Sequence, residues 1–403
     1  MFGKPLAYVV KIDKITPIAG ADRIELAQVM DYTVVVKKNE YKAGDLAIYI
    51  EVDSILPDGL TDELRDKYNR IKNGEELANA TEDEVKTALK SIQDKSKYPA
   101  FEFLRNKNFK IKSMKLGKFG VISQGILFKP TDLGITEYKR GQDFTLQLNI
   151  TTLVEDEEEA GVAVTTKSWL TKKLMRFAWF RDYWKSHTVK ETWNPTWPSK
   201  SDEENVQRVF TKMKEKYGDR EWVATEKLEG QNITIFTKEV RKLFGGKKKT
   251  VGVCSRTREL NPDGNNKAFW STVIREGLDK KIAAIPGEWF CRGEHVGPGI
   301  QKNWYKLPRT TVRFFDFYEK VDGKYRKLNF EESIAFSKKY DLPFVPVLDE
   351  HYKLPETAQE MLKQSDKKTV FGNNLTHKRE GFVLRLRDDY NVSFKVKNPF
   401  YEL

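Results

Sequence analysis

A lysine followed two residues later by a carboxylate and then a glycine occurs three times in the chain, as Lys227-Leu-Glu-Gly230, Lys320-Val-Asp-Gly323 and Lys378-Arg-Glu-Gly381. A lysine amine can act as a nucleophile, but only after it has lost its proton. Because a free lysine has a pKa of about 10.4, neighbouring cations or burial must lower that pKa before the amine can attack at neutral pH. The tetrapeptide alone does not say which of the three lysines has this chemistry.

The flanking residues distinguish the three lysines. Lys320 lies between the alternating run VRFFDFYE and the short segment KYRKLNF, where Asp322 and Gly323 predict a tight hairpin turn. Lys378 stands close to the end of the sequence, too late to be followed by a nucleotide-binding domain. Lys227 follows the strand-like EWVATE and precedes QNITIF, so its side chain is expected at a strand–turn junction. Lys227 is therefore the predicted nucleophile.

Charged residues in later segments fit a site around this lysine. They are, in chain order, Arg256, Glu294, Glu380, Lys395 and Lys397. Residues two apart on a strand face the same side, so Lys395 and Lys397 are expected to point together, toward the α-phosphate of a nucleotide. Three carboxylates, Glu229, Glu294 and Glu380, are suited to a divalent cation, held directly or through water.

Each of these features also has an ordinary structural explanation. A Glu-Gly pair is commonly a turn, and a pair of lysines on a strand is commonly a solvated face. Their joint order along the chain is what favours a single site.

The first third of the chain has the pattern of a small β-barrel. The segments YVVKI, RIELAQV, YTVVVKK and DLAIYIEV are separated by turn residues, which predicts an OB-like barrel. Between Pro57 and Pro99 the sequence becomes polar, and Thr81 with Glu84 forms a capping box ahead of an amphipathic run. We expect a helical insertion at about 58–98.

Five consecutive acids, Glu155 to Glu159, predict a linker, because like charges repel and nothing apolar there can pack. We therefore expect an OB-like nucleic-acid-binding domain at 1–150, an acidic linker at 151–163 and a second domain at 164–403. A length of 403 residues agrees with two or three domains. The predicted fold class is α+β.

The overall charge points to a polyanionic partner. Lys plus Arg outnumber Asp plus Glu by 71 to 59, a net charge of +12. The basic stretch from Arg105 to Lys118, with Phe103 and Phe109 beside it, is either a nucleic-acid groove or a solvated strand face. No apolar run is long enough for a membrane span, and both cysteines, Cys254 and Cys291, are expected to be reduced thiols in a cytoplasmic protein.

The motifs together resemble the covalent nucleotidyltransferase superfamily of ligases and capping enzymes. KLEG, SRT, RGE, FFDFYE, EGFVLR and FKVKN follow the motif order of that superfamily. Within it, ADRIE, YKAGD, VDSILP, SQG, SKSDEENVQ and GEHVGPGIQ are similar to ATP-dependent RNA ligases of the Deinococcus type, which carry an OB module first. The resemblance implies an ATP-grasp-like ligase domain of antiparallel sheets and helices, in which ATP and Mg²⁺ or Mn²⁺ are used.

The resemblance also implies a reaction in three steps. The Lys227 amine attacks the α-phosphorus of ATP to form lysyl-AMP, AMP passes to an RNA 5′-phosphate, and a 3′-OH displaces AMP. The RNA ends could belong to a nick in a duplex or an RNA–DNA hybrid, and the enzyme is expected to act as a monomer. The resemblance implies the following contacts: Glu226 and Phe315 with the nucleotide, Arg256 with ribose or phosphate, Glu294 with ribose, Glu229 and Glu380 with metal-bound water, and Lys395 and Lys397 with the α-phosphate.

The sequence departs from the family pattern at two points, and it leaves two alternative functions open. Glu229 replaces the more usual Asp of the lysine motif, and the helical insertion is longer than the family pattern. DNA ligases and capping enzymes continue into a C-terminal OB domain, whereas six residues follow Lys397, which favours an RNA ligase. A DNA ligase or guanylyltransferase that uses the same lysine chemistry is one alternative, and a non-catalytic RNA-binding protein is the other.

Overall fold

The computed structural model describes residues 5–152, 193–194, 196–199, 203–242, 246–262 and 267–401. The chain divides into two compact units, Met1–Gly161 and Val162–Glu402. The first two residues of the expected acidic linker form strand β10 (Thr151–Thr152), which pairs with β6 (Ser54–Ile55), so they belong to the first unit. The rest of that linker, and the start of the expected second domain at 164–192, lie outside the described residues.

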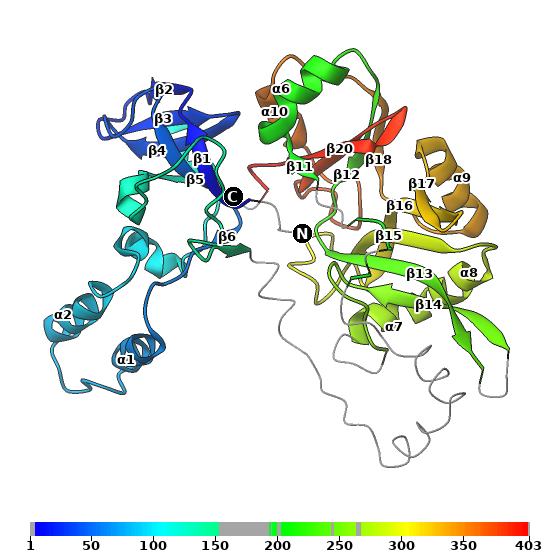
Figure 1. Ribbon diagram of the computed structural model, residues 1–403, viewed down its shortest axis with the longest axis horizontal. Helices are drawn as coiled ribbons and strands as arrows, with labels where there is room; N and C mark the ends of the chain where they lie inside the picture. Colours follow the sequence, from blue (N-terminus) through cyan, green and yellow to red (C-terminus); the bar gives the residue numbers. More distant parts are fainter. Residues whose placement is uncertain are drawn as a thin grey trace. The chain divides into compact units, whose positions relative to one another are not determined.

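The first unit is built from short antiparallel strands (Figure 1). One sheet has the order β1-β5-β9 and another has the order β2-β3-β4. Their bounds are Ala7–Lys11 for β1, Lys14–Pro17 for β2, Ile24–Val29 for β3, Tyr32–Lys37 for β4, Leu46–Ile50 for β5 and Ile126–Phe128 for β9. The four β-rich segments expected from the sequence are all strands here.

Two apolar clusters lie on opposite faces of the β1–β5 pair. Ala7 and Val9 of β1 belong to one cluster, whereas Tyr8 and Val10 belong to the other. Because successive side chains of a strand point to opposite faces, a strand with a core on both sides must be apolar at every position. This explains why YVV and AIYI are buried at successive positions, whereas burial alternates along β3.

The helical insertion contains two helices, α1 (Asp62–Lys72) and α2 (Glu82–Gln93), followed by the 3-10 helix η1 (Pro99–Lys107). The predicted capping box at the start of α2 is confirmed, because the Glu84 backbone N–H donates to the Thr81 hydroxyl and the Thr81 N–H donates to the Glu84 carboxylate. The helix α1 begins in the same way, with Thr61 accepting from Leu64. Ile71 and Ile92 are buried between the two helices.

Arg105 joins this insertion to the rest of the first unit. Its guanidinium lies over the ring of Tyr68 in α1 at 4.7 Å and over the ring of Phe109 at 4.9 Å, and it pairs with Glu102. Only 10% of its side chain is exposed. Arg105 therefore has a structural role, in contrast to its expected place in a basic groove.

The remaining basic residues of that segment follow η1 and enter a short hairpin. This hairpin is formed by β7 (Met114–Leu116) and β8 (Val121–Ser123). Phe103 in η1 is 62% exposed, and Lys107 and Lys118 are exposed as well. The alternatives of a nucleic-acid surface and a solvated face thus stay open for the residues other than Arg105.

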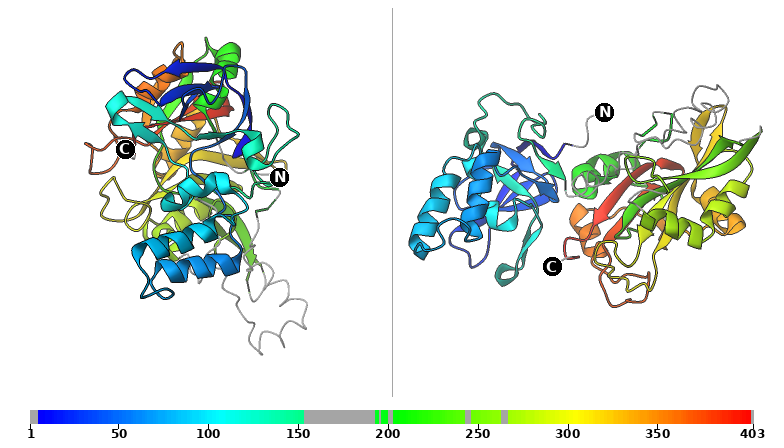
Figure 2. Two further views of the ribbon diagram at one scale, coloured as in Figure 1. Left: turned by 90° about the vertical axis from the view of Figure 1, so that its left-hand side faces the viewer. Right: turned by 90° about the horizontal axis from the view of Figure 1, so that it is seen from below.

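The second unit contains two five-stranded sheets (Figures 1 and 2). The first has the order β11-β20-β19-β12-β18, and only its β11–β20 pair is parallel. Its strands are Glu204–Asn205, Asp389–Lys397, Gly381–Leu386, Trp222–Glu226 and Val347–Tyr352 in that order. The second sheet has the antiparallel order β14-β13-β15-β16-β17, with strands Lys247–Cys254, Gln231–Arg241, Trp289–Val296, Thr311–Val321 and Lys324–Lys327.

Helices cover one face of each sheet. Buried residues of α6 (Val206–Tyr217) and α10 (Ala358–Ser365) share a cluster with Trp222 and Phe394 of the first sheet. Those of α7 (Lys267–Arg275), α8 (Leu278–Ala284) and α9 (Phe330–Tyr340) share a cluster with Ile233 and Cys291 of the second sheet. The opposite face of the second sheet carries another buried cluster, which includes Phe236, Cys254 and Phe290.

The observed mixture of strands and helices confirms the α+β class. Cys254 and Cys291 are both buried, and neither forms a disulfide, as expected for reduced thiols. Burial raises the pKa of both thiols, so they are inert. In the part of the chain that the structure describes, no helix has the length and apolar character needed to cross a membrane.

Candidate active site

Lys227 directly follows β12, a strand whose five residues are all buried between β19 and β18. Its backbone N–H donates to the Gly381 carbonyl at 3.1 Å, and its Nζ lies 2.5 Å from Oε1 of Glu380. The Lys227 side chain is 24% exposed, which leaves the amine within reach of a ligand.

The other two lysines with the same tetrapeptide are used differently. Asp322 and Gly323 both have positive φ between β16 and β17, which confirms the predicted hairpin turn after Lys320. Lys320 pairs with Glu288 at 2.8 Å, and Lys378 pairs with Asp366 at 2.7 Å. The geometry thus separates Lys227, beside several other charged residues, from its two sequence counterparts.

Lys227, Gly381 and Lys397 form one row across three strands. Phe382 pairs with Glu226 on one side and Val396 on the other, and the next step of the register aligns Gly381 with Lys227 and with Lys397. Because Phe394 and Val396 point into the helix-covered core, Lys395 and Lys397 point to the opposite face. Gly381 has no side chain, so nothing from the middle strand stands between the two lysines.

Glu294, in β15, interacts with several charged residues of this group. Burial, together with the carboxylates of Glu380 and Glu203, raises its pKa to about 8, although the charges of Lys227 and Arg256 lower it. Arg256 lies in the bend after β14. These electrostatic interactions bring together four of the predicted site residues, namely Lys227, Arg256, Glu294 and Glu380.

Glu229 is held by two tyrosines that the sequence did not indicate. Its backbone N–H donates to the Tyr305 hydroxyl at 2.6 Å, and the Tyr401 hydroxyl donates to its Oε2 at 3.1 Å. Burial and the nearby carboxylates of Glu380 and Glu229 raise the pKa of Tyr305, which keeps the hydroxyl protonated. The two tyrosines come from the loop before β16 and from the C-terminal turn, so no local sequence pattern connects them with Glu229.

Glu226, predicted to contact adenine, is 2% exposed. Its Oε1 accepts from the Thr369 hydroxyl, and its Oε2 accepts from the Val370 backbone N–H at 3.0 Å. Burial raises the pKa of this carboxyl, although these hydrogen bonds and the charge of Arg379 lower it. Both oxygens therefore already have a partner from the loop that precedes β19.

Phe315 lies at an irregularity in the β15–β16 pair. Arg292 is opposite Asp316 and Gly293 is opposite Phe314, so Phe315 is the extra residue of a bulge. The bulge turns Phe315 toward a cluster with Leu228, next to the lysine motif.

A buried group of charged side chains joins the two sheets beneath the site. Arg385 of β19 is 2% exposed, and its Nε lies 3.1 Å from Oδ1 of Asp316 in β16. The same carboxylate accepts from Lys327 at 2.9 Å. Although burial raises the pKa of Asp316, the charges of Arg385 and Lys327 hold it below its usual value. The carboxylate therefore stays ionised and links both sheets.

Glycines at two of the motifs are required by close packing within the chain. A Cβ at Gly381, where φ is +149°, would lie 2.0 Å from the Val396 carbonyl oxygen. A Cβ at Gly230 would lie 2.5 Å from the His295 carbonyl oxygen and 2.8 Å from Cγ of Glu294. The absence of a side chain at these positions lets neighbouring strands approach.

The carboxylates predicted for a divalent cation do not form a direct cage. No group of three or more His, Cys, Asp or Glu side chains among the described residues could hold a metal ion by itself. Oε2 of Glu380, however, is buried without a hydrogen-bond partner in the described structure. This orphaned acceptor fits a cation that is bound largely through water, so the metal role of Glu229, Glu294 and Glu380 stays a prediction.

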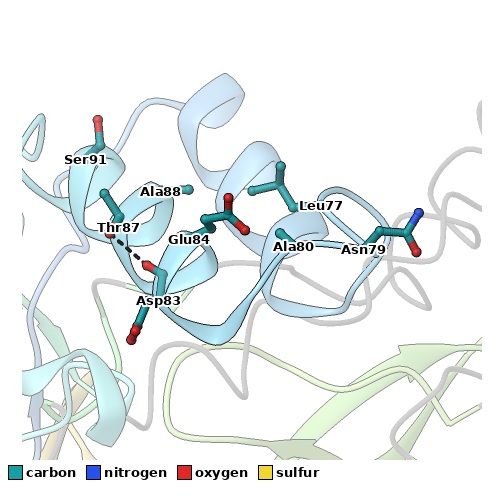
Figure 3. A pocket seen from close by; sticks show the side chains of 8 residues that line it. All are labelled: Leu77, Asn79, Ala80, Asp83, Glu84, Thr87, Ala88 and Ser91. Carbon is teal, nitrogen blue, oxygen red and sulfur yellow. Dashed lines mark hydrogen bonds between the residues drawn. The ribbon is translucent and has the colours of Figure 1, made fainter.

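A shallow pocket also occurs in the first unit, on the helical insertion (Figure 3). Leu77, Ala80 and Ala88 line it, and Thr87 donates to the Asp83 carbonyl at its edge. None of the predicted site residues lines this pocket.

Comparisons with known proteins identify both parts of the chain. Residues 220–397 match the RNA ligase family, and residues 6–81 match an OB-fold domain. The first match includes all the predicted site residues and the second covers the strands β1 to β6. Among curated proteins no match is found.

Solved structures of an RNA ligase from Naegleria gruberi are similar over the whole chain. A lysine-to-alanine variant with ATP and Mn is 25% identical, with a TM-score of 0.68, and the match covers 98% of each chain. A structure with PPi is 24% identical, with a TM-score of 0.68, over 99% of this chain and 98% of that one. The match at residues 220–397 thus identifies an RNA ligase domain, and an OB-fold domain precedes it, so the chain has the domains of an ATP-dependent RNA ligase.

Proposed function

We propose that the chain is an ATP-dependent RNA ligase of the Deinococcus type, which seals 3′-OH and 5′-phosphate RNA ends through lysyl-AMP on Lys227. The observation that carries the proposal is the position of this lysine. It shares one row of the sheet with Lys397 and lies 2.5 Å from Glu380. Related structures with ATP and Mn or with AMP and Mn support the choice of nucleotide.

In the first step, the unprotonated Nζ of Lys227 attacks the α-phosphorus of ATP, and the bond to the β-phosphate oxygen breaks. Pyrophosphate leaves and AMP stays on the lysine. Glu380 Oε1 is placed to hold the ammonium and to accept its proton before the attack. The side chains of Lys395 and Lys397 share the face of Lys227 and stabilise the charge that develops on the α-phosphate.

In the second step, an oxygen of the RNA 5′-phosphate displaces Nζ from the AMP phosphorus. In the third step, a 3′-OH attacks the 5′-phosphate and AMP leaves, which forms the phosphodiester. A divalent cation, Mg²⁺ or Mn²⁺, bound through water near Glu229, Glu294 and Glu380 would neutralise the phosphates. In this proposal Arg256 contacts ribose or a phosphate, Glu294 contacts ribose, and Glu226 and Phe315 contact the nucleotide, in a monomeric cytoplasmic enzyme.

Covalent labelling tests the proposal. Incubation with ATP labelled at the α-phosphate and Mg²⁺ or Mn²⁺ should label the unsubstituted protein but not Lys227→Ala. Lys320→Ala is the matched control, because Lys320 has the same tetrapeptide but stands before a hairpin turn, paired with Glu288. Equal labelling of Lys227→Ala would refute the assignment of the nucleophile.

Two further comparisons separate the alternatives. Labelling with GTP in preference to ATP would indicate a guanylyltransferase, and sealing of nicks with a DNA 3′-OH end in preference to an RNA 3′-OH end would indicate a DNA ligase. RNA binding without any covalent adduct would indicate a non-catalytic binding protein.

A further inference from the structure

Two loops next to the site are joined into one surface. The first, residues 297–310, connects β15 to β16, and the second, residues 367–379, precedes β19 (Figure 2). The Asn373 backbone N–H donates to the Tyr305 carbonyl at 2.8 Å, and the Asn374 amide donates to the Trp304 carbonyl at 2.9 Å. A Cβ at Gly372 would lie 2.6 Å from Cβ of Tyr305, so the contact is close. We name the exposed side of these two segments the paired-loop surface.

The paired-loop surface is strongly cationic. Neither segment contains an Asp or a Glu. Five of its cations are exposed and make no ion pair with any carboxylate of the described residues: Lys302, Lys306, Arg309, Lys367 and Lys368. Such an uncompensated group of cations attracts a polyanion, because each phosphate that it neutralises releases a counterion.

The same loops also contain buried nitrogen atoms that lack a hydrogen-bond partner in the described structure. Trp304 and His377 stack with ring centroids 4.5 Å apart, and Nε1 of Trp304 and Nε2 of His377 are buried without a hydrogen-bond partner in the described structure. Nε of Arg379, a residue only 8% exposed, also lacks a partner there. Unsatisfied buried donors require an explanation, and oxygen-rich ligands such as phosphate and ribose supply acceptors.

Both loops are bonded to the residues that flank Lys227. Tyr305 of the first loop accepts from the backbone of Glu229, and Thr369 and Val370 of the second loop bind the carboxylate of Glu226. The paired-loop surface is therefore built into the frame of the catalytic lysine and is not a remote patch.

We propose that the paired-loop surface binds the sugar–phosphate backbone of the RNA strand whose end reacts at Lys227. This inference rests on the proposed function and adds the position of the substrate. The exposed cations contact phosphates, and the stacked Trp304–His377 pair supplies a rigid support. Val370 and Leu375, which are 55% and 54% exposed, add apolar contact area for sugars and bases.

A variant with four substitutions, Lys302→Ala, Lys306→Ala, Arg309→Ala and Lys368→Ala, tests the inference. The matched control removes the same charge from exposed lysines elsewhere in the second unit, by Lys280→Ala, Lys324→Ala, Lys338→Ala and Lys339→Ala. The dissociation constant for a nicked RNA duplex is measured at several KCl concentrations. The measurement requires no catalysis, so it remains informative even if Lys227 proves not to be the nucleophile.

The paired-loop variant should bind the nicked duplex at least tenfold more weakly, about 1.4 kcal/mol. The slope of log affinity against log salt should become less steep by about 0.9 for each phosphate that the variant no longer neutralises. A variant that carries arginine in place of Lys302, Lys306 and Lys368, and keeps Arg309, should bind like the unsubstituted protein because the charge is retained. This result separates a role of charge from a folding defect. Equal weakening by the control, or unchanged affinity of the paired-loop variant, would overturn the inference.

Discussion

The Lys227 ammonium lies 2.5 Å from the Glu380 carboxylate, although 153 residues separate the two in sequence. The pair forms where β12 ends and β19 begins, and all five residues of β12 pair with β19. The strand register thus positions the nucleophile and its nearest carboxylate together, before any nucleotide binds.

This relationship predicts the effect of Glu380→Gln. The amide keeps the shape of the side chain but cannot accept a proton from the amine or hold it by charge. A charge-assisted hydrogen bond contributes about 1.5–3 kcal/mol, so covalent labelling by ATP should slow by about ten- to a hundredfold. Glu288→Gln removes the corresponding partner of Lys320 and should leave the rate unchanged. Equal rates for Glu380→Gln and the unsubstituted protein would show that the ion pair has no role.

Stability should depend on pH through Glu294, whose pKa is raised to about 8. Between the ordinary carboxyl pKa of the unfolded chain and about 8, the folded state binds a proton that the unfolded state has lost. Stability should therefore fall as the pH rises through this window, by at most about 1.4 kcal/mol per pH unit. Glu294→Gln cannot ionise, so its urea midpoint should fall less between pH 6 and pH 8 than that of the unsubstituted protein. The idea fails if both proteins show the same pH slope.

The buried pair of Asp316 and Arg385 should be important for stability. Asp316→Asn removes the charge that faces both Arg385 and Lys327 and leaves these two buried cations with only the more distant Glu203, 3.6 Å from Arg385, as a counter-charge. The free energy of unfolding, measured by urea denaturation, should decrease by about 3–5 kcal/mol. Glu239→Gln, which breaks an exposed pair with Lys247, is the control and should change it little. A similar small effect for Asp316→Asn would contradict the prediction.

Gly381→Ala should disrupt the row that contains Lys227 and Lys397. The new methyl group would lie 2.0 Å from the Val396 carbonyl oxygen at a backbone angle that disfavours any side chain. We expect a lower melting temperature together with a loss of ATP labelling. Gly117→Ala meets no atom within 4 Å and is the matched control. Normal labelling and melting of Gly381→Ala would mean that the strands can separate without cost.

The sequence predicts four strands of the first unit, β1, β3, β4 and β5, and the capped helix after Thr81, because periodicity and capping are local. It also favours Lys227 among three equal tetrapeptides, since the flanking segments differ in strand pattern. In the structure Lys227 lies beside Glu380 and near Glu294. Their roles in binding and catalysis stay predictions.

The contacts that sequence reasoning missed are all long-range. Tyr305 and Tyr401 hold Glu229, and Thr369 and Val370 hold Glu226, from segments at least 76 residues away. No periodic pattern encodes such pairings. Arg105 was grouped with exposed lysines because its charge is visible in the sequence, while the two rings that enclose it are not adjacent to it along the chain.

The enclosure of Arg105 ties the helical insertion to the β-structure by more than the peptide chain. The guanidinium contacts the ring of Tyr68 in α1 and the ring of Phe109, so the insertion and the β-structure each supply one of the rings. A protein engineered without residues 62–93 would therefore lose Tyr68 and expose the guanidinium of Arg105 on that side. For this reason the insertion is an integral part of the first unit, whatever length it has in related enzymes.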